Sequence, residues 1–188
     1  MTKMAPLVLS VRRPTESASI RKNGGAGEGS CRFCAAPAKP RELFSFLDED
    51  GACPFCHLVR HLDRPNIDGE AVLIWLPELT QAALIAIVHE CHRRLVKHGM
   101  QHLAGVGRPA IGDEFIPVET REALAAIAAL RGRVDEVEAR LGSSSPKALA
   151  QALLRVNANT YAERARRLHG VRLMPLGRIA RPAAQTVS

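Results

Sequence analysis

The sequence predicts an α+β fold in which a small cysteine-rich unit with a short β-sheet precedes a helical C-terminal part. Two C-x-x-C pairs lie in the first third of the chain, at Cys31 and Cys34 and at Cys53 and Cys56. Downstream, the apolar run AVLIWLPE at 71–78 is partly β-branched and predicts a buried strand. Apolar residues at helical spacing follow this run and predict the helical part.

The composition is that of one soluble globular domain with tails. The chain has 188 residues, of which 46% are hydrophobic and 24% charged. Only 4% are aromatic, which argues against a protein that stacks several bases on aromatic rings. No apolar run approaches the roughly 20 residues of a membrane helix, and the basic pair at 12–13 follows the first apolar run, the reverse of a signal peptide. We therefore expect a cytoplasmic protein without a membrane span.

The positive charge is concentrated at the two ends. The net charge of +7 combines +3 over residues 1–30, −2 over residues 31–163 and +6 over residues 164–188. A nucleic-acid-binding domain usually carries its basic surface on the folded body, and here the body is nearly neutral. The basic ends either contact phosphate or acidic lipid without specificity or are solvated termini that aid solubility.

We divide the chain into four parts. They are a short strand plus a flexible linker at 1–30, a cysteine-rich metal-binding domain at 31–104, a helical region packed on it at 105–169, and a basic tail at 170–188. The strand is expected at 5–13, and the glycine-rich stretch 22–30 is expected to be the linker. We expect the chain from Arg172 onward to be poorly ordered.

Two long helices are predicted after the buried strand. Thr80 is a suitable N-cap for the first, which ends near Gly99. The second begins near Thr120 and ends at Gly142, with apolar residues at heptad-like steps of three and four.

Two shorter helices complete the predicted C-terminal part. Ser145 and Pro146 begin one of them, and the other lies at 160–168. We also expect a peptide-binding groove where the strand at 71–76 and the helix at 80–98 meet the later helices.

The two cysteine pairs have the spacing of a zinc site. Two residues separate the cysteines of each pair, so that a tight turn can aim both sulfurs at one cation, and 18 residues separate the pairs. The alternatives are redox dithiols and plain buried cysteines. Phe33 and Phe55 of the two C-x-F-C motifs are expected beside the site, with Arg32, Lys39 and Arg41 offsetting its negative charge. The predicted Zn²⁺ ligands are Cys31, Cys34, Cys53 and Cys56.

A site with four cysteine ligands is predicted to be structural, because a catalytic zinc keeps one position for water. The binding energy of the metal then stabilises a segment with little core of its own. The fifth cysteine, Cys91, lies on the apolar stripe of a helix and is expected to be a small buried residue. His89 and His92 on the same helix lack the four-residue spacing of H-E-x-x-H, so no second metal is predicted there.

The string C-x-x-C-H at 53–57 is also the ending of a zinc-bearing HNH nuclease, and it matches a c-type haem attachment site. Haem attachment occurs outside the cytoplasm, and the other cysteine pair competes for the same cysteines. An HNH nuclease needs a histidine base in the gap between the pairs and an asparagine that orients it. The 18-residue gap contains neither residue type. We therefore expect an HNH-like ββα zinc fold with no catalytic residues.

Three segments carry a family resemblance. APLVLSVRR at 5–13, the paired C-x-F-C motifs and AVLIWLPELTQAAL at 71–84 together resemble the DotN (IcmJ) family of type IVB (Dot/Icm) secretion systems. The resemblance covers about residues 5–100. The stretch between the cysteine pairs is shorter here than in the family, and the C-terminal helices match only in character.

The resemblance implies an HNH-like zinc fold without established nuclease function, with the same four cysteines as ligands. It also implies a cytoplasmic subunit of the type IV coupling complex, held on the C-terminal extension of the coupling ATPase DotL beside other coupling-complex subunits.

Two functions follow from these observations. The first is a non-catalytic adaptor that binds the coupling ATPase and helps to recruit substrates, which accounts for the missing base, the neutral body and the apolar helical residues at 123–141. The alternative is an HNH-type endonuclease or a zinc-dependent nucleic-acid-binding protein, which accounts for the C-x-x-C-H ending and the basic ends.

Overall fold

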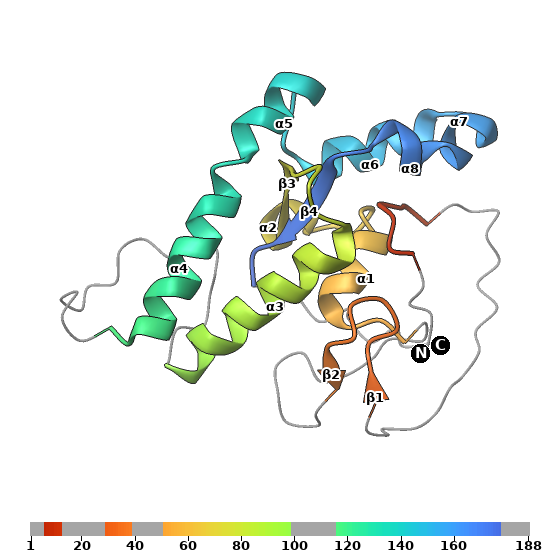
Figure 1. Ribbon diagram of the computed structural model, residues 1–188. Coiled ribbons are helices and arrows are strands. Elements are labelled where there is room, and N and C mark those ends of the chain that lie inside the picture. The colour runs from red at the N-terminus through yellow and green to blue at the C-terminus, as the bar shows by residue number, and fades with distance from the viewer. Residues whose placement is uncertain (1–5, 13–28, 39–50, 99–115, 178–188) are drawn as a thin grey trace.

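Short antiparallel strand pairs and helices together form the α+β architecture that the sequence predicts. The structure is a computed structural model and describes residues 6–12, 29–38, 51–98 and 116–177. A small strand pair near the N-terminus and a second strand pair are joined and covered by helices, which make up most of the C-terminal half (Figure 1). Among the described residues, no helix has both the length and the apolar character that crossing a membrane requires.

The central sheet joins two strands that are far apart in the sequence. β3 (Ala71–Trp75) runs antiparallel to β4 (Val171–Pro175) (Figure 1). The ladder continues beyond both strands, because the N–H groups of Leu76 and Leu176 donate to carbonyls that flank the opposite strand. The sheet residues that are fully buried in the core are Leu73, Ile74, Leu173 and Met174.

The strand predicted at 71–78 is confirmed in β3, but the prediction that the chain is poorly ordered from Arg172 onward is wrong over β4. The basic character of this region concealed the strand in the sequence. Arg172 is partly buried, and its guanidinium donates to the Leu79 carbonyl at 2.7 Å. The predicted basic tail at 170–188 therefore begins with a strand, and its last residues, 178–188, lie outside the described part of the chain.

The outer edge of β3 is covered by the chain segments that connect later helices. The N–H of Leu73 donates to the Ser144 carbonyl at 2.9 Å, and the N–H of Trp75 donates to the Arg133 carbonyl at 3.1 Å. Unpaired strand edges invite association with other chains. These two bonds close this edge without adding a third strand.

The outer edge of β4 is closed by one side chain. Gln81, the first residue of α3 (Gln81–Lys97), donates from Nε2 to the Leu173 carbonyl and accepts from the Leu173 N–H, both at 2.8 Å. β4 therefore lies between β3 and α3, and the peptide groove expected where the strand at 71–76 and the helix at 80–98 meet the later helices stays a prediction.

α3 begins where the sequence predicts. The Thr80 hydroxyl accepts from the Ala83 N–H at 3.1 Å, which is the N-cap bond. The helix is capped at its other end by His98, and the predicted stop at Gly99 lies outside the described residues. The apolar side chains that α3 buries are Leu84, Ile85, Val88, Cys91 and Leu95.

The single helix predicted over 120–142 is wrong, because the chain forms two helices there. α4 (Val118–Arg131) ends one residue before Gly132, and α5 (Val134–Leu141) begins two residues after it. The break lets the Arg133 carbonyl reach the edge of β3. Heptad-like spacing persists across the break, but the two helices no longer share one apolar face.

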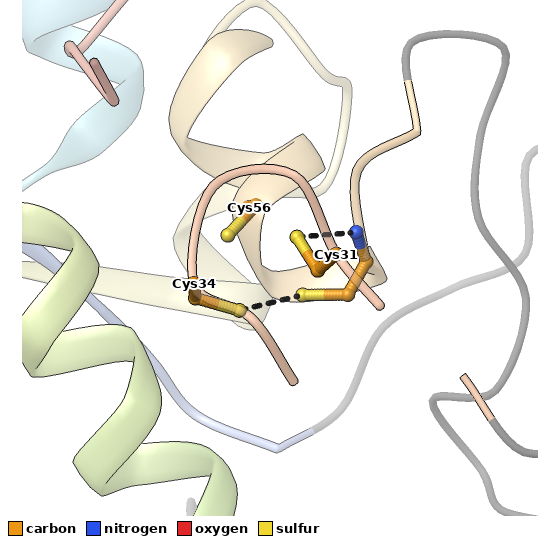
Figure 2. Close-up of side chains that lie close together, drawn as sticks. Cys31, Cys34 and Cys56 are labelled. Carbon is orange, nitrogen blue, oxygen red and sulfur yellow. Dashed lines mark hydrogen bonds between the residues drawn. The ribbon is translucent and has the colours of Figure 1, made fainter. Parts of the chain in front are cut away.

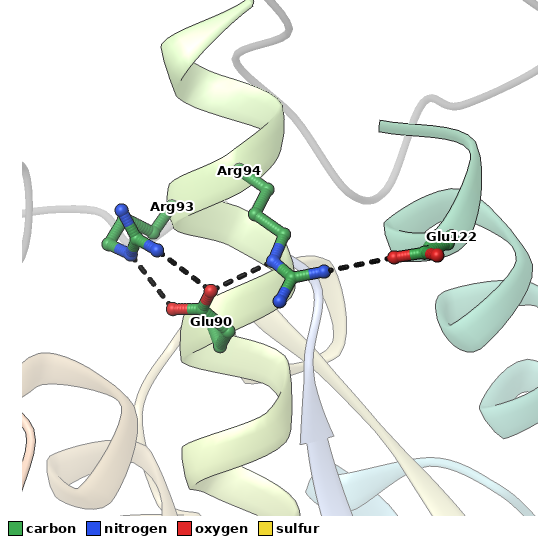
Figure 3. Close-up of polar contacts among 4 residues, drawn as sticks. All are labelled: Glu90, Arg93, Arg94 and Glu122. Atoms are coloured by element: carbon green, nitrogen blue, oxygen red, sulfur yellow. Dashed lines mark hydrogen bonds and ion pairs between the residues drawn. The ribbon is translucent and has the colours of Figure 1, made fainter. Parts of the chain in front are cut away.

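α4 runs back along α3, and a charged network joins the two helices (Figures 1 and 3). The Glu90 carboxylate accepts from Arg93 and Arg94 at 2.8 Å, and Arg94 also reaches Glu122 of α4 at 3.4 Å. These hydrogen bonds, from Arg93 first and then from Arg94, lower the pKa of Glu90 to about 2.

The start of α6 (Pro146–Arg155) is held by two side chains. Ser145, the predicted N-cap, accepts from a backbone N–H of the first turn at 3.0 Å. Asp68 of α2 (Ile67–Glu70) accepts from the Ser145 hydroxyl at 2.8 Å and from the Lys147 N–H at 3.0 Å. The Asp68 carboxylate therefore lies at the N-terminus of α6, which is the positive end of the helix dipole.

The short helix predicted at 160–168 is present as two short helices, which bond to residues near the N-terminus. They are α7 (Ala158–Ala162) and α8 (Arg164–Arg167). Tyr161 and Arg164 both bond to residues near the N-terminus.

Residues 6–12, called the N-terminal segment below, form no strand, which corrects the strand predicted at 5–13 over the residues that the structure describes. The Ser10 N–H donates to the Val59 carbonyl, and the Ser10 carbonyl accepts from the Leu62 N–H, both at 3.0 Å. The segment therefore pairs with the end of a helix and the turn that follows it, not with the sheet.

Replacing Gly170 by alanine should destabilise the fold strongly. Gly170 has a φ of +89°, and a Cβ atom there would lie 2.5 Å from the Trp75 ring. The left-handed backbone and the displaced ring together should lower the free energy of unfolding by about 3 kcal/mol. Gly142→Ala is the matched control, because its φ is +76° but its surroundings are open. It should cost only about 1 kcal/mol. If chemical denaturation shows the same loss in free energy of unfolding for Gly170→Ala and Gly142→Ala, the role of Trp75 is contradicted.

Glu90→Gln should lower stability by less than about 1 kcal/mol at neutral pH, because the charged network is exposed. The pKa of Glu90 falls from its ordinary 4.5 to about 2 on folding, so its contribution is complete above pH 4.5. It should disappear as the pH falls toward 2. Urea titrations of the wild-type and Glu90→Gln proteins between pH 7 and pH 2 measure this change. Their free energies of unfolding should become equal as the pH falls. Glu136→Gln, which removes a single pairing with Arg133, should show a smaller difference at pH 7.

Candidate metal centre

The first cysteine pair lies in a tight turn between two very short strands. β1 (Gly29–Ser30) pairs antiparallel with β2 (Pro37–Ala38), so the linker predicted at 22–30 ends in a strand. The Cys31 N–H donates to the Ala36 carbonyl at 2.9 Å across the turn. The turn folds the chain back on itself and brings both cysteines of the pair to one side.

The second cysteine pair lies at the start of α1 (Pro54–Arg60). Cys53 is the N-cap residue with an extended backbone, and Pro54 follows at the first helical position, where proline is favoured. Cys56 lies in the first turn and is fully buried. The order strand, strand, helix matches the ββα unit that the sequence predicts.

The structure brings all four predicted ligands together. Their sulfur atoms lie within 4.8 Å of one another and are buried (Figure 2). The sulfurs of Cys34 and Cys53 are 3.7 Å apart, and the Cys53 N–H donates to the Cys31 sulfur at 3.3 Å. This cluster can hold a metal ion.

The four thiols cannot all ionise without a cation beside them. Hydrogen bonds from the thiols of Cys34, Cys53 and Cys56 hold the pKa of Cys31 far below its usual range. The same contacts, with Cys31 first and Cys34 second, raise the pKa of Cys53 and of Cys56, and burial adds to this effect. The Cys31 thiolate therefore suppresses ionisation of Cys53 and Cys56, and a bound cation is what allows four thiolates to coexist.

Two guanidinium groups lie against an aromatic ring beside the cluster. The Arg32 and Arg60 guanidinium carbons are each 5.3 Å from the Phe33 ring centroid. Phe33 and Phe55 are buried in the same core cluster as the four cysteines, as predicted. The two rings are buried, and both guanidinium groups lie over Phe33, the ring between the two cysteines of the first pair.

Sequence reasoning found Arg32 but missed Arg60. Arg60 lies on the α1 helix one turn after Cys56, so helical spacing was the signal that could have identified it. Lys39 and Arg41, the other predicted counter-charges, lie outside the described residues.

The cysteine and histidines of α3 lie in the core. Cys91 is buried, as predicted, and burial raises the pKa of its thiol. The rings of His89 and His92 meet the Phe55 ring edge-on, with centroids 5.8 and 6.0 Å apart. Within the described ranges, the four-cysteine cluster is the one group of three or more ligand-type side chains close enough to share a metal.

Two further half-buried histidines, His57 of α1 and its C-cap residue His61, lie one turn apart. The ring centroids of His57 and His61 are 4.2 Å apart. Burial, and then the neighbouring charge of His57, lowers the pKa of His61 to about 4. Sequence reasoning singled out His57 alone.

A scan against models of known protein families finds no match to this chain, and a search of curated proteins finds no relative.

Purified protein should contain one metal ion per chain, and Cys31→Ser should abolish it. A structural zinc-type site supplies about 10 kcal/mol or more of binding free energy, so metal removal should unfold the region from β1 to α1. Elemental analysis and circular dichroism measure the two effects. Cys91→Ser is the matched control, because Cys91 is also buried but lies outside the cluster. A Cys31→Ser protein with a full complement of metal would contradict the assignment.

Proposed function

We propose that this chain is a non-catalytic, zinc-containing adaptor subunit of a type IV secretion coupling complex. It binds the coupling ATPase, through the C-terminal extension of that protein, and helps to recruit substrates. The observation that carries the proposal is the buried cluster of four cysteine sulfurs. Four protein ligands complete a tetrahedral sphere, so the metal has a structural role and offers no position to a substrate.

The donor set supports zinc as the metal. Four thiolates are soft ligands, and zinc accepts them at tetrahedral geometry without a redox change. The turn at 31–36 and the first turn of α1 present two sulfurs each. This arrangement suits one ion between the turn and the helix.

The composition of the gap between the cysteine pairs supports an absence of catalysis. Residues 35–52 contain no histidine and no asparagine, so an HNH nuclease base has no counterpart there. His57 lies outside that gap in the sequence, and its ring packs beside that of His61.

The segment that carries the family resemblance also has a defined role in this fold. The string at 71–84 supplies β3, the Thr80 cap and the Gln81 clamp on Leu173. The resembling residues therefore build the central sheet and its closure.

The proposal is tested by capture of partners from the native host. Tagged full-length chain should retain a coupling ATPase when salt rises from about 50 to 500 mM, because apolar contacts depend little on ionic strength. Deleting residues 178–188, which include two arginines, should leave this capture unchanged. Capture of nucleic acid alone, released by moderate salt and lost with the deletion, would overturn the adaptor function.

The alternative is an HNH-type endonuclease or a zinc-dependent nucleic-acid-binding protein. It is favoured by His57, which directly follows Cys56, and by Arg166 and Arg167, whose side chains are 76% and 54% exposed. In the same preparations, supercoiled plasmid with Mg²⁺, Mn²⁺ or Ni²⁺ should stay intact. Nicking that His57→Ala abolishes would establish the alternative.

A further inference from the structure

A cavity lies along the edge of β3 that faces away from β4. Its volume is about 400 Å³, which falls in the range of small-molecule sites. α2 directly precedes β3, and α5 and the start of α6 pack on the strand (Figure 1). The cavity lies among these elements and the end of α4, and it is called the edge cavity below.

Much of the lining of the edge cavity is apolar. Val72 of β3, Val134 of α5 and Leu176, which follows β4, are half-buried and line it. Pro146, the first residue of α6, is buried and also lines it. These side chains come from four segments of the chain that only the folded structure brings together. The lining suits the aliphatic part of a ligand.

Two oxygen atoms that can accept hydrogen bonds lie where α2 joins β3. The Asp68 carboxylate uses one oxygen, Oδ1, for its bonds from Ser145 and Lys147, and its Oδ2 has no donor in the described chain. The register of the sheet turns the backbone of Ala71 away from β4. Its N–H is bonded to the Ile67 carbonyl, and its own carbonyl has no donor among the described residues. These two oxygens suit a group with several N–H donors.

A positive charge comes from another part of the cavity lining. Arg131 lies in the last turn of α4, and its guanidinium has no acidic partner within the described parts of the chain. The carbonyl of Arg133, two residues later, bonds to Trp75 at the end of β3. Asp68 lies just before the start of the same strand. The two charges therefore approach the edge of β3 from its opposite ends.

The loop between α5 and α6 adds a hydroxyl to the lining. The Ser143 Oγ accepts from the Ser145 N–H at 3.1 Å, so its own proton is free to donate. The Ser144 carbonyl holds this loop on β3 through the Leu73 N–H. The hydroxyl is therefore in place before a ligand binds.

One carboxylate and one guanidinium restrict the chemistry of the ligand. A simple anion would be repelled by Asp68, and two N–H groups at the start of α6 are already bonded to Asp68 and Ser145. A simple cation would be repelled by Arg131. A molecule that carries both a positive and a negative charge satisfies both side chains.

We propose that the edge cavity binds a small zwitterionic molecule of the amino-acid class with an aliphatic side chain. Its ammonium group donates to the Asp68 carboxylate and the Ala71 carbonyl. Its carboxylate accepts from Arg131 and Ser143, and its side chain packs on the apolar lining. The inference is independent of the proposed adaptor function, because it involves neither the metal centre nor a partner protein.

Calorimetric titration of the full chain with amino acids tests the proposal. At least one of L-valine, L-isoleucine and L-leucine should bind with a Kd of about 1 mM or lower. If L-leucine binds, 4-methylpentanoate, which lacks its ammonium group, and 3-methylbutylamine, which lacks its carboxylate, should each bind at least about tenfold more weakly. The corresponding truncated analogues serve for the other two amino acids. Binding by none of the three amino acids would overturn the proposal. An analogue that binds as tightly as its parent would overturn the two-charge assignment.

Two variants test the assigned contacts. Arg131→Gln should weaken amino-acid binding by at least about tenfold and leave the free energy of unfolding unchanged, because the side chain is exposed. Arg121→Gln, on the same helix but outside the cavity, is its control and should bind normally. Asp68→Asn should weaken binding to a similar extent, and its amide oxygen can still accept at the start of α6. Asp135→Asn, an exposed change in α5, should have no effect.

Amide NMR spectra of the full chain locate the bound amino acid. The Val72 and Ser144 signals should shift as the amino acid is added, whereas the signal of Leu84, buried on α3, should not. Binding that shifts neither Val72 nor Ser144 would place the ligand elsewhere and overturn the proposal. Binding that neither Arg131→Gln nor Asp68→Asn weakens would also overturn it.

Discussion

Mutual repulsion among four sulfur atoms is the constraint on which the N-terminal half depends. Thiolates within 4.8 Å of one another are stable only around a cation. The elements that carry them are two strands of two residues each and a helix of seven residues, which have little stability alone. A metal ion bound to these sulfurs would fix the position of α1. The end of α1 and the turn after it in turn bond to Ser10 of the N-terminal segment.

The C-terminal half depends on the pairing of two strands, β3 and β4, that are far apart in the sequence. β3 is complete only when β4 returns to it, and every helix from α4 to α8 lies in the connection between them. The Gln81 side chain and the Ser144 and Arg133 carbonyls then take the places of neighbouring strands. A sheet of two strands normally has little independent stability. Here these hydrogen bonds and the packing of α3 provide the stabilisation that further strands would otherwise give.

Local signals in the sequence predicted the metal ligands, β3 and the helix caps. Cysteine spacing identified the four sulfurs, and Thr80 and Ser145 marked helix starts, because each signal depends only on residues a few positions apart. The break at Gly132–Arg133 was missed, since its cause is the edge of β3. β4 was missed because Arg172 and Pro175 disfavour a strand locally, and only pairing with β3 outweighs them. The N-terminal segment was predicted as a strand from its alternation, but its partners are a helix end and two side chains.

The stacking of Trp75 has a consequence for observing this protein in solution. Trp75 is the only tryptophan in the chain, and it lies against Gly170 with the Arg140 guanidinium 4.0 Å from its ring centroid. Indole emission shifts and changes in intensity when water or a cation moves relative to the ring. Its fluorescence therefore reports one event, the joining of β4 to β3 beneath α5, and gives a native optical signal for the step that closes the C-terminal half. The metal centre contributes no tryptophan, so assembly of that centre is optically silent in the same measurement.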